Sequence, residues 1–313
     1  MDRKFEASFV RYLSAKKTVD DRALSPTVWE AVERSLAQRD GSESRPLKIL
    51  ELGSGIGTMV ERIVERAMLP ADIPAEYTLV DSIEENSVAA YRRLSNFWKG
   101  VGAHVEIREG SIFVTVPDAS PKTFHFVTED AFGFMGNPKA QAKYDLLIAN
   151  AFLDLVNLDA ALEAMVPMLR PEGLFYFSIN YDGITGFEPT IELKIDQLIE
   201  TLYNKDMEKK RFNRLPVGGE RSGRALLHKM IKADLTILGA GGSDWIVYPQ
   251  NGSYKADEAY FLRFIIHTID GALTGHPELD QVAFKDWIEK RQAQIDAGEL
   301  IYVTHQLDIC AQS

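Results

Sequence analysis

The sequence predicts an α/β fold with a doubly wound, mostly parallel sheet. From Leu47 onward, short apolar runs alternate with helical patterns, which is typical of a parallel sheet with helices on both faces. The run at 144–150 is almost entirely apolar, as expected of a strand that is covered on both faces. A glycine-rich turn follows the first strand, where open α/β sheets bind their ligands.

Residues 1–45 are expected to form a helical cover that precedes the main domain. Phe9 and Tyr12 fall on one helical face. The stretch 40–46 is polar and rich in turn residues, so we interpret it as a linker. The predicted division is an N-terminal helical cover, 1–45, and a main domain, 46–313.

The main domain is predicted element by element from apolar periodicity. Strands are expected at 47–53, 76–82, 104–110, 124–132, 144–150 and 174–180, with helices at 58–68, 84–98 and 158–169. Pro167 should shorten the last of these helices. Later segments are expected as helices around 191–202, 226–231, 256–273 and 281–296, a strand with a glycine-rich interruption at 235–249, and a final strand at 300–311.

Composition excludes several classes of protein. The formal net charge of −11 argues against a general nucleic-acid binder, which needs clustered Lys and Arg. No uncharged apolar run approaches the ~18 residues of a membrane span, and the N-terminus lacks the pattern of a signal peptide. Cys310 is the single cysteine, so a disulfide scaffold is excluded and a cytoplasmic location is expected. The six histidines show no metal-ligand spacing, so no metal is expected.

The strongest signal is the run ELGSGIG at 51–57, between a strand and a helix. Glycines there allow a tight turn and a close approach of a ligand to the backbone. The spacing G-x-G-x-G is one residue shorter than the dinucleotide fingerprint G-x-G-x-x-G. The carboxylate of Glu51 beside the loop would repel a pyrophosphate but suits a cationic ligand.

Two further acidic residues end later strands. Asp81 closes the second strand, where its carboxylate can accept hydrogen bonds from both hydroxyls of a ribose. Asp130 follows a later strand, where it can meet an adenine amino group. The segment 109–111 competes with Asp130 for this contact, and we favour Asp130 because the aromatic Phe132 follows it.

Five ordered motifs within residues 47–182 resemble the class I S-adenosylmethionine-dependent methyltransferases. They are ELGSGIG, LVDS with Asp81, Asp130-Ala131, YDLLIANAF and LRPEGLFYF. The resemblance implies a sheet of seven strands whose last strand, at 300–311, is antiparallel. It also implies helical lid insertions at about 183–234 and 256–297.

The resemblance implies S-adenosyl-L-methionine as cofactor, with S-adenosyl-L-homocysteine as product. The implied cofactor-binding residues are Glu51, Gly53, Ser54, Gly55, Gly57, Asp81, Ser82, Asp130, Ala131, Asn150 and Ala151. Asn150 also fits a plain turn at the end of a strand. Arg22 could reach the methionine carboxylate of the cofactor, or belong to a solvated helix face with Asp20 and Asp21.

The acceptor side is less specific. Arg221 and Arg224 would suit a carboxylate acceptor and fit a surface pair equally well. Trp245 and Tyr248 could line the acceptor pocket or pack in the core. Three weak candidates for a general base are Asp154, Tyr203 and His305, of which Asp154 also suits a helix start and His305 a core position.

The predicted function is methyl transfer from S-adenosylmethionine to a small-molecule acceptor, without nucleic acid or membrane as partner. An NAD(P)-dependent oxidoreductase is the first alternative, disfavoured because Asp81 lies 28 residues after Gly53, against about 20 in the dinucleotide pattern. A non-catalytic cofactor-binding scaffold and a protein methyltransferase are the others. Residues 1–45 and the C-terminal helices could serve a homodimer as readily as a lid.

Overall fold

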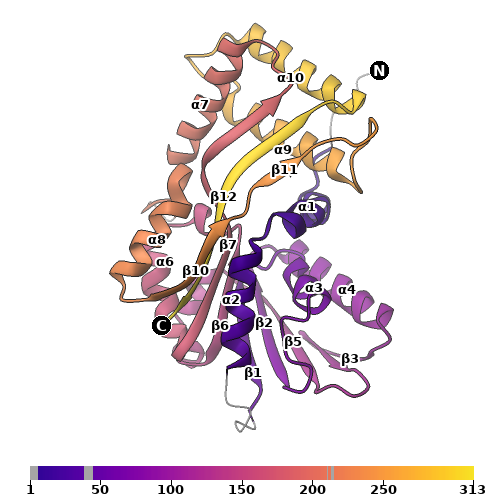
Figure 1. Ribbon diagram of the computed structural model, residues 1–313, viewed down its shortest axis with the longest axis vertical. Coiled ribbons are helices and arrows are strands. Elements are labelled where there is room, and N and C mark those ends of the chain that lie inside the picture. Colours follow the sequence, from indigo (N-terminus) through magenta and orange to yellow (C-terminus); the bar gives the residue numbers. More distant parts are fainter. Residues whose placement is uncertain (1–5, 39–44, 210, 213–214) are drawn as a thin grey trace.

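The computed structural model describes residues 6–38, 45–209, 211–212 and 215–313. Its centre is a mostly parallel sheet with helices on both faces, and an upper lobe continues from one side of that sheet (Figure 1). The expected α/β class is therefore confirmed. Most of the expected linker, 40–46, lies outside the described residues.

The strands run in the order β10-β12-β7-β6-β1-β2-β5-β4-β3, with β11 also paired to β12. Four pairings are parallel: β1 with β2, β1 with β6, β2 with β5 and β6 with β7. β12 is antiparallel to β7, as expected of the last strand. The bounds are β1 Leu47–Leu52, β2 Ala75–Asp81, β3 His104–Arg108, β4 Ser111–Thr115, β5 Lys122–Thr128, β6 Tyr144–Asn150, β7 Leu169–Glu188, β10 Thr236–Gly242, β11 Trp245–Val247 and β12 Ile301–Gln312.

The helices divide between the two faces of the sheet because successive strand residues point in opposite directions. Ile49 belongs to the core cluster with α2, α3 and α4, and Leu50 to the cluster with α5, α6 and α8. The helix bounds are α1 Phe9–Ala23, α2 Pro26–Ala37, α3 Thr58–Glu65, α4 Glu84–Gly100, α5 Ala131–Met135, α6 Leu158–Met165, α7 Leu193–Lys209, α8 Ser222–Lys232, α9 Glu258–Leu273 and α10 Gln281–Ala297. Pro167 follows the end of α6, as expected.

The sheet has ten strands in the described residues, not the seven expected. The additional strands include β4, which forms an antiparallel hairpin with β3 and pairs with β5. Gly110 makes the hairpin turn with a φ of +67°. Sequence periodicity missed β4 because it is only five residues long and lies between turn-rich stretches.

The upper lobe is built on an extension of two central strands. β7 spans 20 residues, not the expected 174–180, and β12 spans 12. Both continue upward with β11 beneath α7, α9 and α10 (Figure 1). The expected lid insertion at 183–234 therefore begins as strand, and only then becomes helical.

A buried carboxylate marks the point where β7 bends into the upper lobe. The pairing of β7 with β12 shifts register between Leu307 and Ile309, and Ile179 opposite has a φ of +57°. Oδ1 of Asp308 accepts a hydrogen bond from the Ile179 amide at 2.8 Å, and Oδ2 accepts one from the Ser25 amide at 2.9 Å. Asp308 therefore joins β12, β7 and the start of α2.

None of the described helices is long and apolar enough to cross a membrane.

Candidate active site

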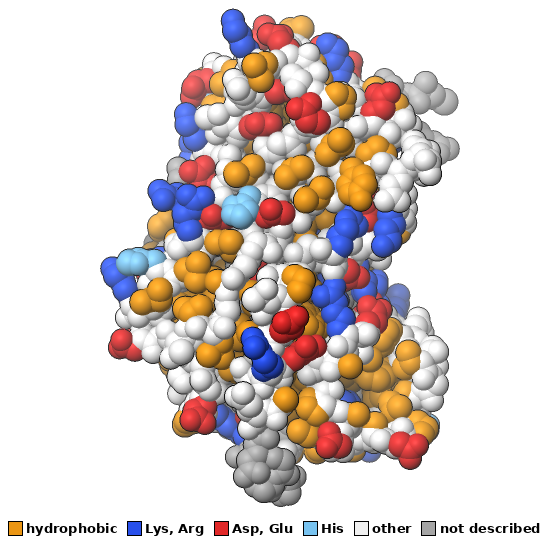
Figure 2. Space-filling model, in the orientation of Figure 1, with side chains coloured by type: hydrophobic (Ala, Val, Ile, Leu, Met, Phe, Trp, Pro, Cys, Tyr) orange, Lys and Arg blue, Asp and Glu red, His pale blue; other side chains and the backbone are white. Residues whose placement is uncertain are grey.

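A pocket of about 580 Å³ opens at the carboxyl ends of β1, β2 and β6 and continues under the upper lobe. In the space-filling view the molecule narrows between the sheet half and the upper lobe (Figure 2). α1 lies at this level and contributes Phe9, Tyr12, Leu13, Lys16 and Asp20 to the pocket wall. The pocket thus has an inner part at the sheet and an outer part in the lobe.

The glycine loop adopts a backbone that favours glycine at three positions. Gly53, Gly55 and Gly57 have φ values of +66°, +53° and +77°. Gly53 and Gly55 line the pocket. Gly57 was expected to contact the cofactor but is not among the lining residues, and a Cβ there would lie 3.0 Å from Leu94. Its structural role is close packing of α3 on α4.

Asp81 fixes the loop to the end of the second strand. Its Oδ2 accepts a hydrogen bond from the Gly55 amide at 2.8 Å, and its Oδ1 accepts from the Ile83 amide and from Asn86. Asn86 is 2% exposed, lines the pocket, and its Oδ1 accepts no hydrogen bond within the described residues. An unsatisfied buried acceptor costs about 1–3 kcal/mol, so a ligand that donates a hydroxyl here would relieve that cost.

Glu51 lies at the base of the same loop and is 2% exposed. Burial raises the pKa of its carboxyl from 4.5 to about 8, against opposing effects of the Tyr77 hydroxyl and the Arg62 charge. The Tyr77 hydroxyl donates to Oε2 at 2.8 Å. A cationic group that enters the pocket would stabilise the ionised form, because an opposite charge favours ionisation.

Asp130 lies at the rim of the inner part and caps α5. Its Oδ1 accepts from the amides of Phe132 and Gly133 at 3.0 and 3.1 Å. Asp130, Ala131 and Ser82 all line the pocket. The competing segment 109–111 is at the turn between β3 and β4 and does not.

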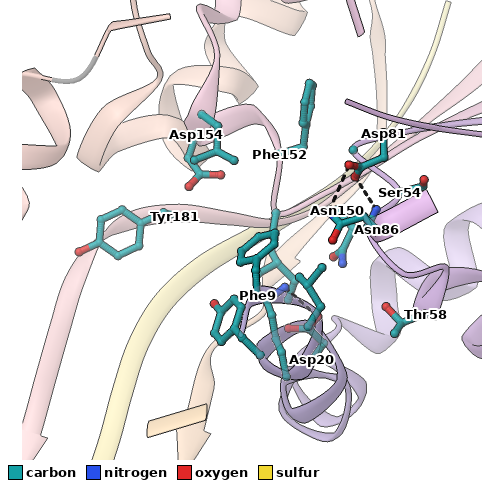
Figure 3. A pocket seen from close by; sticks show the side chains of 18 of the residues that line it. Phe9, Asp20, Ser54, Thr58, Asp81, Asn86, Asn150, Phe152, Asp154 and Tyr181 are labelled. Carbon is teal, nitrogen blue, oxygen red and sulfur yellow. Dashed lines mark hydrogen bonds and ion pairs between the residues drawn. The ribbon is translucent and has the colours of Figure 1, made fainter. Parts of the chain in front are cut away.

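Asn150 and Ala151 end β6 and line the pocket where its inner and outer parts meet. The Ser178 hydroxyl donates to Oδ1 of Asn150 at 2.9 Å, and the Ala151 amide donates to the Ser178 carbonyl. Figure 3 shows Asp81 and Asn86 on one side of the pocket, with Asp154 and Tyr181 on the other. Phe152 also lines the pocket, and a Cβ on Gly53 would lie only 2.6 Å from its ring.

The floor of the outer part is the sheet extension. Tyr181 of β7 lies opposite Gln306 of β12, and Thr304 lies opposite both Thr185 and Trp245. Partners across an antiparallel pair share a face, and all five residues line the pocket. The Thr185 hydroxyl forms hydrogen bonds with the Tyr181 hydroxyl at 2.9 Å and with the Thr304 hydroxyl at 3.3 Å. Of these five residues only Trp245 was expected from the sequence, because the pairing of β7 with β12 joins positions more than a hundred residues apart.

Among the expected acceptor residues, Trp245, Asp154 and Tyr203 line the pocket. Trp245 is buried and its Nε1 donates to Asp20 at 2.9 Å. Tyr248 is absent from the lining residues and is 47% exposed, because it follows the end of β11 and points to the surface.

The expected arginines lie outside the pocket. Arg22 donates to Glu258 at 2.5 and 2.8 Å and to the Ile246 carbonyl, so it ties α1 to α9 and β11. Arg224 donates to Asp182 at 2.8 Å on the surface. Arg221 is exposed and is not a lining residue. The residues adjacent to each arginine in the sequence do not show which distant carboxylate its guanidinium group will bind.

His305 is also outside the pocket. It lies 2.7 Å from Oδ1 of Asp244 and is partly exposed. Side chains alternate along β12, so His305 points away from the face that carries Thr304 and Gln306. No cluster of three or more metal-ligating side chains occurs in the described part of the chain.

Several lining residues were missed by the sequence reasoning. They are Lys16 and Asp20 of α1, Asn86 of α4, Phe264 of α9 and Gln306 of β12. Lys16 and Asp20 are buried charged residues in a helix, yet a single sequence does not show which helix face is covered. Asn86 offered a signal, because it lies one helical turn after the acidic strand end at Asp81.

No protein-family model matches the chain, and no curated protein matches it. Solved structures are similar to it. One is an S-adenosylmethionine-dependent methyltransferase from Thiobacillus denitrificans in complex with S-adenosyl-L-homocysteine, at 13% identity, 98% coverage of this chain and 99% of that chain, with a TM-score of 0.45. Another is geranyl diphosphate C-methyltransferase from Streptomyces coelicolor A3(2), at 13% identity, 91% and 76% coverage, and a TM-score of 0.42.

Proposed function

We propose that the protein transfers a methyl group from S-adenosylmethionine to a small-molecule acceptor. The observation that carries the proposal is one continuous pocket in which an acidic, glycine-lined inner part meets an aromatic outer part. Glu51, Asp81 and Asp130 all line the pocket, and Lys16, the one lysine or arginine among the described lining residues, is paired with Asp20. Such a surface suits a ligand that carries a sulfonium and an ammonium group.

The residues fit the parts of this cofactor one by one. Asp81 and Asn86 would hold the ribose, because one offers a carboxylate and the other a buried carbonyl oxygen in need of a donor. Asp130 would accept from the adenine amino group. Glu51 and the Gly53 turn would hold the amino-acid end.

S-adenosylmethionine supplies a methyl group on a positively charged sulfur. The acceptor forms the new bond to the methyl carbon, the electrons of the broken C–S bond stay on sulfur, and any acceptor proton leaves to solvent or a side chain. The chain's contribution is alignment of the two reactants, for which effective molarities of about 10⁵–10⁸ M are known. The outer walls of α1, α7 and α9 exclude water, which favours a reaction that disperses charge.

An oxidoreductase that binds NAD(P) is the alternative on this kind of sheet. It is disfavoured by the acidic inner part, because Asp81 and Asp130 would face a pyrophosphate, whereas Lys16, the one lysine or arginine among the described lining residues, is paired with Asp20. A non-catalytic scaffold would keep the inner part and lose the outer one. The intact outer part, with its hydroxyl network, favours an enzyme.

Calorimetric titration with S-adenosylhomocysteine and, separately, with NAD tests the proposal. We expect micromolar binding of S-adenosylhomocysteine and none of NAD, and the reverse would refute a methyltransferase. Gly55→Val should abolish binding, because a Cβ there lies 3.2 Å from Leu13 and the φ of +53° disfavours valine. Gly100→Val is the matched control, since a Cβ on Gly100 meets nothing within 4 Å.

We further propose the division into a helical cover, 1–45, and a main domain, 46–313. It is supported by the position of α1 as one wall of a pocket built otherwise by the later chain. A cytoplasmic location is a second proposal. The single cysteine, Cys310, supports it, because it is buried and free.

A further inference from the structure

The outer part of the pocket presents aromatic faces from several elements. Tyr12 of α1 stacks on Phe264 of α9 with ring centroids 4.1 Å apart, and Phe9 lies 6.3 Å from Phe264. Trp245 and Tyr203 line the pocket from β11 and α7. Aromatic faces carry partial negative charge, so this set of rings can bind either a ring or an organic cation.

The positive charge in the pocket is already engaged. Lys16 is the one lysine or arginine among the described lining residues, and its Nζ lies 2.9 Å from Oδ2 of Asp20. The Trp245 ring covers the same ammonium group at 5.2 Å. Arg62, which is buried behind α1, also forms an ion pair with Asp20, with Nη2 of Arg62 at 3.2 Å from Oδ2 of Asp20. An anionic acceptor would therefore lose its hydration without gaining a cation, which is strongly unfavourable.

A carboxylate also faces the rings. Asp154 lies on the outer side of the pocket near Tyr181 (Figure 3). Desolvation raises the pKa of Tyr12, Tyr181 and Tyr203, and the negative charge of Asp154 raises each of them further. The negative charge of Asp154 therefore acts on residues of three elements around the outer part: α1, β7 and α7.

Gln306 supplies an independent indication of what binds there. It lines the pocket floor, is 2% exposed, and its Oε1 accepts no hydrogen bond within the described residues. A buried amide oxygen without a donor is costly. A ligand that donates an N–H or O–H group to this oxygen would remove that energetic cost. An ionised carboxylate or phosphate has no such group to donate.

We infer that the acceptor of this protein is an organic amine, which binds as a cation between the aromatic rings and Asp154 with an N–H directed to Gln306. Before transfer, the ammonium gives one proton to the Asp154 carboxylate, and the freed nitrogen lone pair forms the bond to the methyl carbon while the C–S electrons stay on sulfur. The inference rests on the proposed methyl transfer, and it specifies the class of acceptor. It excludes phosphates, and it excludes the carboxylates that Arg221 and Arg224 had suggested in the sequence. Neutral alcohols are left as weaker ligands, because they satisfy Gln306 but not Asp154.

The test compares three probes that share a phenyl ring and differ in charge: phenethylamine, 2-phenylethanol and 3-phenylpropionate. Each is titrated into the full chain saturated with S-adenosylhomocysteine. We expect phenethylamine to bind about fivefold or more tighter than 2-phenylethanol, and 3-phenylpropionate not to bind. Equal or tighter binding of the propionate overturns the inference, as does the absence of amine binding to the loaded protein.

Variants separate charge from shape. Asp154→Asn should reduce the ratio of amine to alcohol affinity to about 2 or less, whereas Asp159→Asn, a matched loss of charge on the surface of α6, should leave the ratio unchanged. Phe264→Leu should weaken the amine more than the alcohol. An unchanged ratio in Asp154→Asn refutes the inference. The first titration keeps the two proposals apart, because failure of S-adenosylhomocysteine itself to bind refutes the proposed function instead.

Discussion

The buried carboxyl of Glu51 should make cofactor affinity depend on pH. Its pKa is raised to about 8 by burial, so at pH 7 only about one tenth of the apo-protein carries the ionised form. If the cofactor ammonium needs the carboxylate, the apparent affinity falls in proportion to that fraction. Affinity for S-adenosylhomocysteine should therefore rise by up to about tenfold from pH 6 to 7 and level off above about pH 8.

Glu51→Gln is the matched variant, because an amide keeps the size of the side chain and can still accept from the Tyr77 hydroxyl. It cannot ionise, so its affinity should follow only the titration of the ligand. The two proteins should bind alike near pH 6, where about one hundredth of Glu51 is ionised, and differ by roughly 75-fold at pH 8.5, where about three quarters is ionised. Calorimetry across this range measures both curves. Parallel curves would show that Glu51 does not pair with the ligand.

The raised pKa of Glu51 can also be tested without ligand, by measuring the stability of the protein in thermal unfolding at different pH values. A carboxyl with a raised native pKa holds a proton that the unfolded chain has already lost at neutral pH. Its contribution to stability is complete below about pH 4.5 and is lost as the pH rises through about 8. The wild-type chain should thus lose stability relative to Glu51→Gln over this interval. A constant difference between the two would contradict the reasoning.

Three other substitutions test particular contacts. Asp81→Ala should weaken binding of S-adenosylhomocysteine by about 1.5–3 kcal/mol, measured by calorimetry. A change below a few tenths of a kcal/mol would mean that Asp81 only stabilises the glycine loop and does not bind the ligand. Arg22→Met should destabilise the fold by about 3 kcal/mol, because it leaves the buried Glu258 carboxylate without its cation and with the Thr18 hydroxyl as donor. Adding Glu258→Gln should recover most of that loss in urea unfolding, and if it does not, the pair is not what Arg22 stabilises. Asp308→Ala should cost about 2–4 kcal/mol in the same assay, since two buried backbone amides lose their acceptor; a loss under about 0.5 kcal/mol would mean that water replaces the carboxylate.

Local signals predicted the inner part of the pocket well. Gly53, Gly55 and Asp81 are specified by residue type and by their place at strand ends, and both are readable from one chain. The cofactor contact expected of Gly57 stays a prediction, and Gly57 itself is not among the described lining residues. Its backbone needs glycine, yet the partner that makes it so, Leu94, is in another helix.

The outer part could not be predicted in this way. Whether a guanidinium turns to a ligand or to a distant carboxylate is decided by three-dimensional neighbours, as Arg22 and Glu258 show over 236 positions. The length of β7 was underestimated because pairing with β12, which resumes at Ile184 after a register shift and extends to Glu188, depends on residues far along the chain. Gln306 has no distinctive sequence context at all.

The long ladder between β7 and β12, which shifts register at two points, limits how a ligand can reach the pocket. These two strands pass together from the sheet half into the upper lobe and are paired in both. The lobe therefore cannot swing open about a hinge without breaking several backbone hydrogen bonds. α1 is joined to its surroundings through side chains such as Arg22 and Arg11. Ligand exchange should therefore proceed by displacement of this one helix over a rigid base. Changes of acceptor through evolution would accordingly be expected in the helical walls, with the strand floor left in place.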